Sequence, residues 1–189
     1  MTTHITLNTS DAPSPWVVRW LPVAPGGEVL DLACGRGRHA RLATSLHHSV
    51  VAVDRDPAAL IEATGEGIVT HCVDLEGEGA VWPFDAARFA AVIVTNYLHR
   101  PLLPHLARAL QPGGMLIYET FALGNEAYGK PSNPAFLLAP GELLDMARTA
   151  GLHVLAYEDG VIMSGRHARI QRLCAIAPQF QLSSTPLDM

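Results

Sequence analysis

The sequence predicts an α/β fold in which a doubly wound, mostly parallel sheet carries helices on both faces. Short apolar runs rich in valine, isoleucine and alanine alternate with segments of helical periodicity, the pattern of consecutive βα units. The first unit places a glycine-rich turn between a strand and a helix. The last two apolar runs flank a turn-rich segment, residues 159–166, which suits an antiparallel hairpin. Together these features predict seven strands, with an antiparallel last strand.

The glycine-rich turn is the most informative stretch of the chain. An apolar run, Val29 to Ala33, stops at Gly35-x-Gly37, and a helical pattern resumes over residues 39–46. Glycine permits positive φ and a close approach that a Cβ would block. The following helix start adds unpaired N–H donors. A strand, a turn and a helix in this order predict a site for a nucleotide-type cofactor.

Two cofactor classes fit this turn. Gly35-x-Gly37-x-x-Ala40 matches the relaxed dinucleotide fingerprint, and Asp54 follows at about the twenty-residue spacing that NAD(P) sites use. Asp31 favours the other class, because its carboxylate lies just before the turn and would repel a diphosphate by several kcal/mol. A cofactor that carries an ammonium and a sulfonium group suits this carboxylate better.

Acidic residues also follow the second and third predicted strands. Asp54 ends the run that begins at Ser49, and a carboxylate there can accept hydrogen bonds from both hydroxyls of a ribose. Such bonds contribute about 1.5–3 kcal/mol each. An N-cap role is the alternative, but Asp56, directly before Pro57, is better placed for it. Asp74 is expected to accept from an adenine amine beside Leu75, or else to be a solvated loop acid.

Four segments resemble, in order, the motifs of the class I S-adenosylmethionine-dependent methyltransferases, a family with a Rossmann-like fold. They are Val29–Gly37, Val51–Asp54, His71–Leu75 and Leu110–Ile117, the last containing L-x-P-G-G. The resemblance covers roughly residues 28 to 178. Ala33 stands where many members of the family have glycine. The second half loosely resembles small-molecule enzymes of the tellurite-resistance type.

The resemblance implies S-adenosyl-L-methionine as the cofactor and methyl transfer as the reaction. The residues expected to bind the cofactor lie at the ends of the first four strands: Asp31, Ala33, Cys34, Gly35, Gly37, Asp54, Arg55, Asp74, Leu75, Asn96 and Tyr97. The runner-up functions are an NAD(P)-dependent oxidoreductase and a non-catalytic cofactor-binding module.

The remaining elements follow from periodicity and from turn residues. Strands are expected at 29–33, 49–54, 68–73, 89–96, 115–120, 153–157 and 169–177, and helices at 39–46, from Pro57, at 102–110 and at 140–150. Residues 89–96 are the most apolar of these runs and should be central. Trp82 and Phe84 should dock the preceding turn-rich segment on the domain.

The N-terminal part and one long loop complete the predicted domain. Ser14 and Pro15 predict a helix start, so residues 14–25 are expected to form a cap helix. Trp16 and Trp20 on its apolar face pack on the sheet or cover the pocket. The position of the loop 121–139 after the fifth predicted strand would let it close over the acceptor pocket, and the sequence leaves open whether it does. Residues 1–13 and 179–189 are expected to be a flexible start and a loose tail of one domain, 1–189.

Catalysis of methyl transfer requires mainly that the protein aligns the two reactants and excludes water, because the cofactor supplies the electrophile. A base is needed only if the acceptor arrives protonated. His99, Glu119, Tyr97 and Tyr118 are the candidates, since each lies at or near the carboxyl end of a predicted strand. Alternatively, His99 caps the next helix with Arg100, Tyr118 belongs to the core and Glu119 holds the loop.

Composition excludes several other classes of function. The net charge of −5 gives no basic footprint for nucleic acid, and no apolar run reaches the roughly 20 residues of a membrane helix. Three cysteines without a C-x-x-C spacing are expected to be reduced, and no metal site is expected. We therefore expect a cytoplasmic enzyme acting on a small molecule, and the sequence leaves its oligomeric state open.

Overall fold

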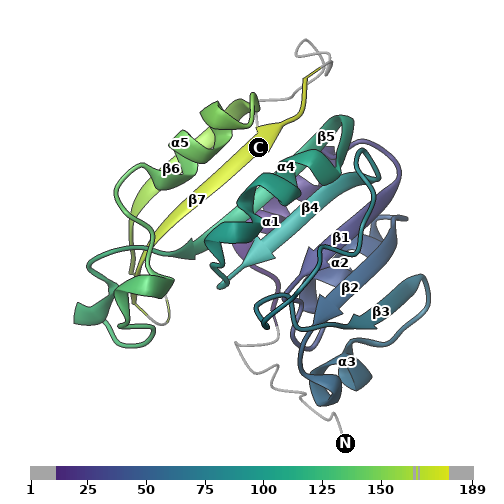
Figure 1. Ribbon diagram of the computed structural model, residues 1–189, viewed down its shortest axis with the longest axis horizontal. Coiled ribbons are helices and arrows are strands. Elements are labelled where there is room, and N and C mark those ends of the chain that lie inside the picture. Colours follow the sequence, from purple (N-terminus) through teal and green to yellow (C-terminus); the bar gives the residue numbers. More distant parts are fainter. Residues whose placement is uncertain (1–11, 164, 166, 179–189) are drawn as a thin grey trace, which may run out of the picture.

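The computed structural model describes residues 12–163, 165 and 167–178. A seven-stranded sheet has the order β3-β2-β1-β4-β5-β7-β6 (Figure 1). Strands β1 to β5 pair in parallel, whereas β7 pairs antiparallel with both of its neighbours. The predicted fold class is confirmed. The strands are β1 Glu28–Leu32, β2 Ser49–Asp54, β3 Ile68–Cys72, β4 Phe89–Thr95, β5 Leu110–Phe121, β6 His153–Ile162 and β7 Ala168–Ile176.

The strand order places a topological switch between β1 and β4. The chain builds the sheet outward from β1 through β2 to β3, then returns to the other side of β1 and continues through β4 to β5. Connections at such a point leave in opposite directions, which opens a crevice outside the carboxyl ends of the strands. As predicted, β4 is central, and all seven of its residues are buried.

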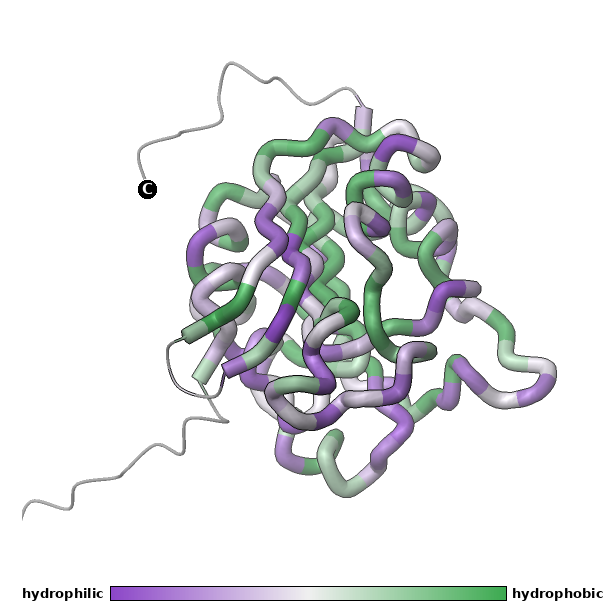
Figure 2. Tube along the Cα trace, turned by 90° about the vertical axis from the view of Figure 1, so that its left-hand side faces the viewer, coloured by the Kyte–Doolittle hydropathy of each residue, from purple (hydrophilic) through white to green (hydrophobic). Residues whose placement is uncertain are grey.

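Helices cover both faces of the sheet, as the repeated βα pattern predicts. Helices α1, α2 and α3 pack in one hydrophobic cluster, and α4 and α5 pack in another on the opposite face (Figure 1). Hydrophobic segments run through the centre of the molecule in Figure 2. The helices are α1 Pro15–Trp20, α2 Arg38–Ser45, α3 Pro57–Ala63, α4 Leu103–Ala109 and α5 Glu142–Thr149, with 3₁₀ turns η1 Leu21–Val23, η2 Arg100–Leu102, η3 Asn125–Ala127 and η4 Pro134–Phe136.

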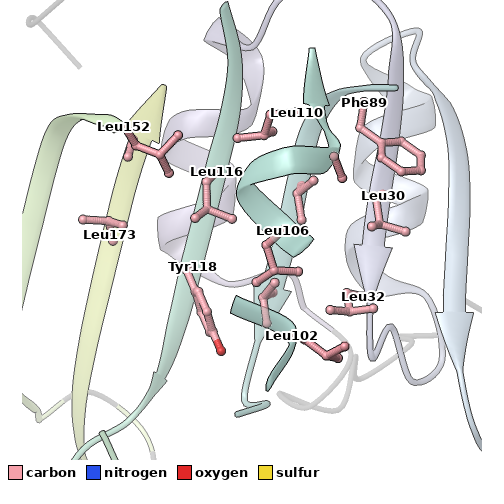
Figure 3. Close-up of a cluster of buried hydrophobic side chains, with 14 of the residues drawn as sticks. Leu30, Leu32, Phe89, Leu102, Leu106, Leu110, Leu116, Tyr118, Leu152 and Leu173 are labelled. Atoms are coloured by element: carbon pink, nitrogen blue, oxygen red, sulfur yellow. The ribbon is translucent and has the colours of Figure 1, made fainter. Parts of the chain in front are cut away.

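The alternation of side chains along β1 decides which residues face each layer. Leu30 and Leu32 pack with α4 and its neighbours in the cluster drawn in Figure 3, whereas Val29 packs toward α1 and α2. Asp31 follows the same alternation and therefore points to the α2 side, because successive side chains of a strand lie on opposite faces. This position removes its carboxylate from solvent.

The two tryptophans of α1 pack on the sheet. Trp16 and Trp20 are buried, and the Trp16 indole N–H donates to the carbonyl oxygen of Leu173 on β7 at 3.1 Å. Helix α1 is shorter than the expected cap helix 14–25, because Pro22 lies in the 3₁₀ turn that follows Trp20. Ser14 caps the helix as predicted, accepting from the Trp16 N–H at 3.1 Å.

Three predicted boundaries differ from the observed ones for local reasons. Helix α5 begins at Glu142, since Gly141 has a φ of 75°, which is not helical. Strand β5 begins at Leu110, and Gly114 permits this because an added Cβ would lie 2.9 Å from the Phe89 carbonyl oxygen. Strand β6 extends to Ile162, pairing with β7 where a turn was expected. Residues 1–11 and 179–189 lie outside the described residues.

Candidate active site

The carboxyl ends of β1, β2 and β3 surround a small pocket next to the topological switch. This first pocket has a volume of about 210 Å³. Its lining combines an apolar floor with charged side chains at the strand ends: Leu32, Ala33, Val53, Asp54, Arg55, Val73, Asp74, Leu75, Glu76 and Tyr97. Six of the eleven residues predicted to bind the cofactor therefore line one pocket.

The glycine-rich turn reverses the chain through residues with positive φ. Ala33, Gly35 and Gly37 have φ values of 53°, 52° and 76°. A Cβ on Gly37 would lie 2.7 Å from the Cβ of Ala63, so glycine is required for α2 to approach α3. A Cβ on Gly35 would meet no atom within 4 Å. Close packing against Ala63 thus explains why residue 37 is glycine. At residue 35, glycine permits the positive φ of the turn and leaves the space beside the turn open.

Asp54 joins the end of β2 to the glycine-rich turn. One carboxylate oxygen accepts from the Gly35 N–H at 2.8 Å, and the other accepts from the Asp56 N–H at 2.9 Å. Asp56 in turn caps α3 by accepting from the Ala58 N–H at 2.9 Å, as predicted. A carboxylate offers about four acceptor sites, so Asp54 keeps capacity for two further donors in the first pocket.

Asp31 lies beneath the turn and does not line the first pocket. It is 1% exposed, and its carboxylate accepts from the Ala40 N–H in the first turn of α2 at 2.9 Å. Burial raises the pKa of Asp31 to about 7. The expectation that this carboxylate faces the ligand directly is therefore corrected, because strand alternation turns it toward the start of α2. The Asp31 carboxylate instead anchors the first turn of α2, the helix that directly follows the glycine-rich turn.

The segment after β3 supplies the opposite wall of the first pocket. Asp74 accepts from the Glu76 N–H at 2.9 Å through Oδ1, which fixes a local turn, and Asp74 also lines the pocket. Leu75 is buried and contributes an apolar surface. Burial, and then the nearby Glu76, raise the pKa of the Tyr97 hydroxyl, so this group stays protonated at neutral pH.

Two larger pockets adjoin the end of β4, and Asn96 lines both of them. The loop pocket, about 340 Å³, is lined by Arg55, Glu76, Asn96, Tyr97, Leu98, Thr120, Phe121, Pro131 and Phe136. The hairpin pocket, about 750 Å³, lies between the residues before α1 and the β6–β7 hairpin. Asn96 has a φ of 56°, a conformation that asparagine tolerates well. Cys34 is buried, and burial raises the pKa of its thiol.

The four candidate catalytic residues separate into two groups. Tyr97 lines the first and loop pockets, and Glu119 lines the hairpin pocket. Tyr118 is buried in the hydrophobic core, where its hydroxyl donates to the Tyr97 carbonyl oxygen at 3.0 Å (Figure 3). His99 lines a separate hollow with Trp82 and His105. The structure therefore places Tyr118 in the core, the alternative position considered for it, and His99 outside the first, loop and hairpin pockets, while the catalytic roles stay predictions.

A buried polar network that sequence reasoning missed links the turn to the hairpin pocket. His39 accepts from the Ser14 N–H through Nε2 at 3.0 Å, and the Ser14 hydroxyl donates to Glu119 at 2.8 Å. Burial lowers the pKa of His39 to about 3, so the ring is neutral and free to accept. Arg172 approaches the other Glu119 oxygen at 3.4 Å. These residues come from distant parts of the chain, and no local pattern connects them.

The loop 121–139 is fastened to the body of the domain. Arg100 donates to the carbonyl oxygens of Ala135 and Leu137 at 2.8 and 2.9 Å and forms an ion pair with Glu142. The Asn125 amide donates to the Pro131 carbonyl oxygen at 2.9 Å and accepts from the Arg169 N–H at 3.0 Å. The loop therefore forms a wall of the loop pocket in this conformation.

Residues 12–163, 165 and 167–178 contain neither a membrane-spanning helix nor a metal-binding cluster. No helix in this part of the chain is long and apolar enough to cross a membrane. The same residues contain no group of three or more histidine, cysteine, aspartate or glutamate side chains arranged to hold a metal ion.

Comparison with known proteins agrees with this geometry. Residues 29–114 match the methyltransferase domain family. A trans-aconitate 2-methyltransferase of Methylobacterium nodulans is 26% identical over 174 residues, covering 75% of this chain and 67% of that protein. An S-adenosylmethionine-dependent methyltransferase structure from Mesorhizobium loti superposes with a TM-score of 0.68 at 17% identity, covering 86% of this chain and 96% of the other.

A third similar protein is TehB from Haemophilus influenzae, with a TM-score of 0.67 and 18% identity over 87% of this chain and 62% of that one. At these identities the solved structures establish the fold, and the family match adds the activity. The chain therefore shares the fold of the S-adenosylmethionine-dependent methyltransferases to which it is similar, and residues 29–114 match a methyltransferase domain. It is a methyltransferase whose cofactor is S-adenosylmethionine.

Replacing Asp54 by asparagine tests its place in the cofactor site. Asp54→Asn removes the charge but keeps one acceptor oxygen for the turn. We expect S-adenosylhomocysteine to bind at least about tenfold more weakly by calorimetry, because hydrogen bonds to charged groups contribute about 1.5–3 kcal/mol. The matched control is Asp56→Asn, which retains an N-cap and should bind normally. If Asp54→Asn bound S-adenosylhomocysteine with wild-type affinity, Asp54 would not contribute to cofactor binding.

The burial of Asp31 predicts a pH dependence of stability. Its native pKa of about 7 exceeds the ordinary value of 3.8, so the native protein holds a proton that the unfolded chain has released. This contribution to stability is present at low pH and is lost as pH rises through 7. Between pH 6 and 8, the free energy of unfolding should fall by about 1 kcal/mol more in the wild type than in Asp31→Asn.

Chemical denaturation at both pH values measures this difference. His39 titrates in the opposite sense, since its native pKa lies below its ordinary value and it destabilises the native protein only as pH falls below about 6.5. The comparison with Asp31→Asn cancels that effect because both proteins retain His39. Equal pH slopes for the two proteins would show that Asp31 is ionised throughout this range.

Proposed function

We propose that the chain transfers the methyl group of S-adenosylmethionine to a small-molecule acceptor bound beside Asn96. The observation that carries this proposal is the arrangement of the pockets. The first pocket meets the loop pocket at Tyr97, and the loop pocket meets the hairpin pocket at Asn96. A cofactor and an acceptor can therefore occupy adjoining spaces along one row of strand ends. Volumes of about 340 and 750 Å³ suit small molecules.

The residues of the first pocket fit a nucleoside. Asp54 has free acceptor capacity for two ribose hydroxyls, and Asp74 presents an acceptor for an exocyclic amine. Leu75 and the ring of Tyr97 supply apolar surface for a base. A Cβ on Gly35 would meet no atom within 4 Å, so the turn leaves open space beside Gly35 for the amino-acid portion of the cofactor. Asp31, Ala33, Cys34 and Arg55 complete the proposed cofactor site as neighbours of these groups.

Asp31 acts on the proposed cofactor site from below the turn. Its carboxylate holds the N-terminus of α2, which keeps the backbone of the turn in place. Above pH 7 its negative charge also favours a cationic ligand over a diphosphate. This electrostatic preference supports S-adenosylmethionine over a nicotinamide dinucleotide.

Methyl transfer requires little of the protein beyond positioning the cofactor and the acceptor. The cofactor supplies an electrophilic methyl group on a sulfonium. Asn96 and the surrounding walls orient the acceptor and exclude water, which converts a bimolecular reaction into one with aligned partners. Glu119 is held by Ser14 and Arg172, so it orients groups at the bottom of the hairpin pocket. Tyr97 keeps its proton, and its hydroxyl is hydrogen-bonded to Glu76 where the first pocket meets the loop pocket.

A thermal-shift comparison tests the cofactor assignment. S-adenosylhomocysteine well above its dissociation constant should raise the melting temperature by several degrees, whereas NAD and NADP should leave it unchanged. Binding to the native state alone produces this shift by mass action. The Asp54→Asn variant serves as the control and should show a smaller shift with S-adenosylhomocysteine. Stabilisation by NADP without stabilisation by S-adenosylhomocysteine would contradict the proposal.

A further inference from the structure

The loop pocket adjoins the first pocket directly. The two pockets share three lining residues, Arg55, Glu76 and Tyr97, whereas the hairpin pocket shares none with the first pocket. Methyl transfer requires the reacting atoms of cofactor and acceptor to come within about 3–3.5 Å of each other. An acceptor in the loop pocket is therefore nearer to a cofactor in the first pocket than an acceptor in the hairpin pocket would be.

The lining of the loop pocket divides by origin into an apolar and a polar group. The apolar and aromatic side chains come from the loop 121–139 and from the segment after β4, and the polar side chains come from the strand ends. One arginine and one glutamate balance each other, so charge does not select the occupant. The apolar group is Leu98, Phe121, Pro131 and Phe136 with the ring of Tyr97, and the polar group is Arg55, Glu76, Asn96 and Thr120.

Phe136 is the most open aromatic side chain of this pocket. It is 48% exposed, whereas Leu137 and Leu138, which follow it, are 1% and 0% exposed. The chain thus buries the next two side chains in the core and leaves the phenylalanine at the pocket. A ring left this open gains little from burial in the free protein, and a ligand in the loop pocket would cover it.

Arg100 holds the backbone on both sides of Phe136. Its Nη1 donates to the carbonyl oxygen of Ala135 at 2.8 Å, and its Nη2 donates to that of Leu137 at 2.9 Å. The Glu142 carboxylate accepts two hydrogen bonds from the same guanidinium, at 2.7 and 2.9 Å, which fixes the arginine in turn. The backbone of residue 136 is therefore placed before a ligand arrives, and this lowers the ordering cost of binding.

We propose that the methyl acceptor carries an aromatic ring that packs against Phe136 in the loop pocket, and that Arg100 positions Phe136 for this contact. This inference rests on the proposed function and names the class of its acceptor. Aromatic pairs in offset or edge-to-face arrangements are stabilised beyond the area they bury. Phe121 and Tyr97 add two further rings to the same lining, and Asn96 offers hydrogen-bonding groups to the polar substituent that receives the methyl.

Two uncharged probes that differ in aromaticity test this proposal. The protein, saturated with S-adenosylhomocysteine, is titrated calorimetrically at neutral pH with 2-naphthol and with its saturated analogue, decahydro-2-naphthol. We expect 2-naphthol to bind at least about threefold more tightly, because only its rings can form aromatic pairs with the lining. The ratio of the two affinities separates this effect from the burial of apolar surface, which both probes provide.

A substitution in the loop locates the preference. Phe136→Leu keeps an apolar side chain and removes the ring, so it should lower the ratio at least about twofold while leaving the affinity for S-adenosylhomocysteine unchanged. The matched control is Tyr128→Leu, which removes a ring of the same loop that is 41% exposed and does not line the loop pocket. This control should keep the wild-type ratio.

A double variant tests whether Arg100 acts through Phe136. Arg100→Gln removes the donors that hold the backbone of the loop, so it should lower the ratio in the same direction as Phe136→Leu. Added to Phe136→Leu, it should lower the ratio no further, because the ring that it positions is already absent. A further decrease in the double variant would overturn the positioning role of Arg100.

The outcomes separate this inference from the proposed function. Failure of S-adenosylhomocysteine to bind would remove the cofactor site and both proposals with it. If S-adenosylhomocysteine binds normally, equal or weaker binding of 2-naphthol relative to its saturated analogue would overturn the aromatic preference alone. Absence of binding by either probe, or an unchanged ratio in Phe136→Leu, would overturn it equally.

Discussion

The bond between the Asp54 carboxylate and the Gly35 N–H is the contact on which the site depends. It ties the end of β2 to the turn after β1 at 2.8 Å, while the second oxygen fixes the start of the next loop. One side chain thus sets the position of the turn and presents unused acceptor capacity to the first pocket. A preformed arrangement of this kind lowers the ordering cost of binding a ligand.

A second acid, Asp31, is fully buried and supports the same turn from the opposite side. Asp31 accepts from the Ala40 N–H, and the neutral His39 beside it accepts from the backbone of Ser14. Buried polar groups are stable only when they are hydrogen-bonded, so this set also fixes the segment before α1 against the sheet. The cofactor turn and the floor of the hairpin pocket are consequently parts of one connected polar structure.

The sequence predicted the fold well because the apolar runs report burial directly. The residues of β4 are all buried and are apolar from Phe89 to Val94, and the glycine-rich turn follows the first strand as expected. The sequence could not show that Asp31 points beneath the turn or that Tyr118 points into the core, because these outcomes depend on strand alternation and on packing against distant helices. From strand-end position alone, His99 was the first candidate for a base and Glu119 the second. Only tertiary structure placed Glu119 in the hairpin pocket and His99 in a different hollow.

A crystal structure of the complex with S-adenosylhomocysteine tests the central claim most directly. The ribose should lie in the first pocket with both hydroxyls within hydrogen-bond distance of the Asp54 carboxylate, and the Asp54–Gly35 contact should persist. A nucleoside bound elsewhere, or a ribose that leaves Asp54 without a ligand contact, would contradict the role assigned to this carboxylate.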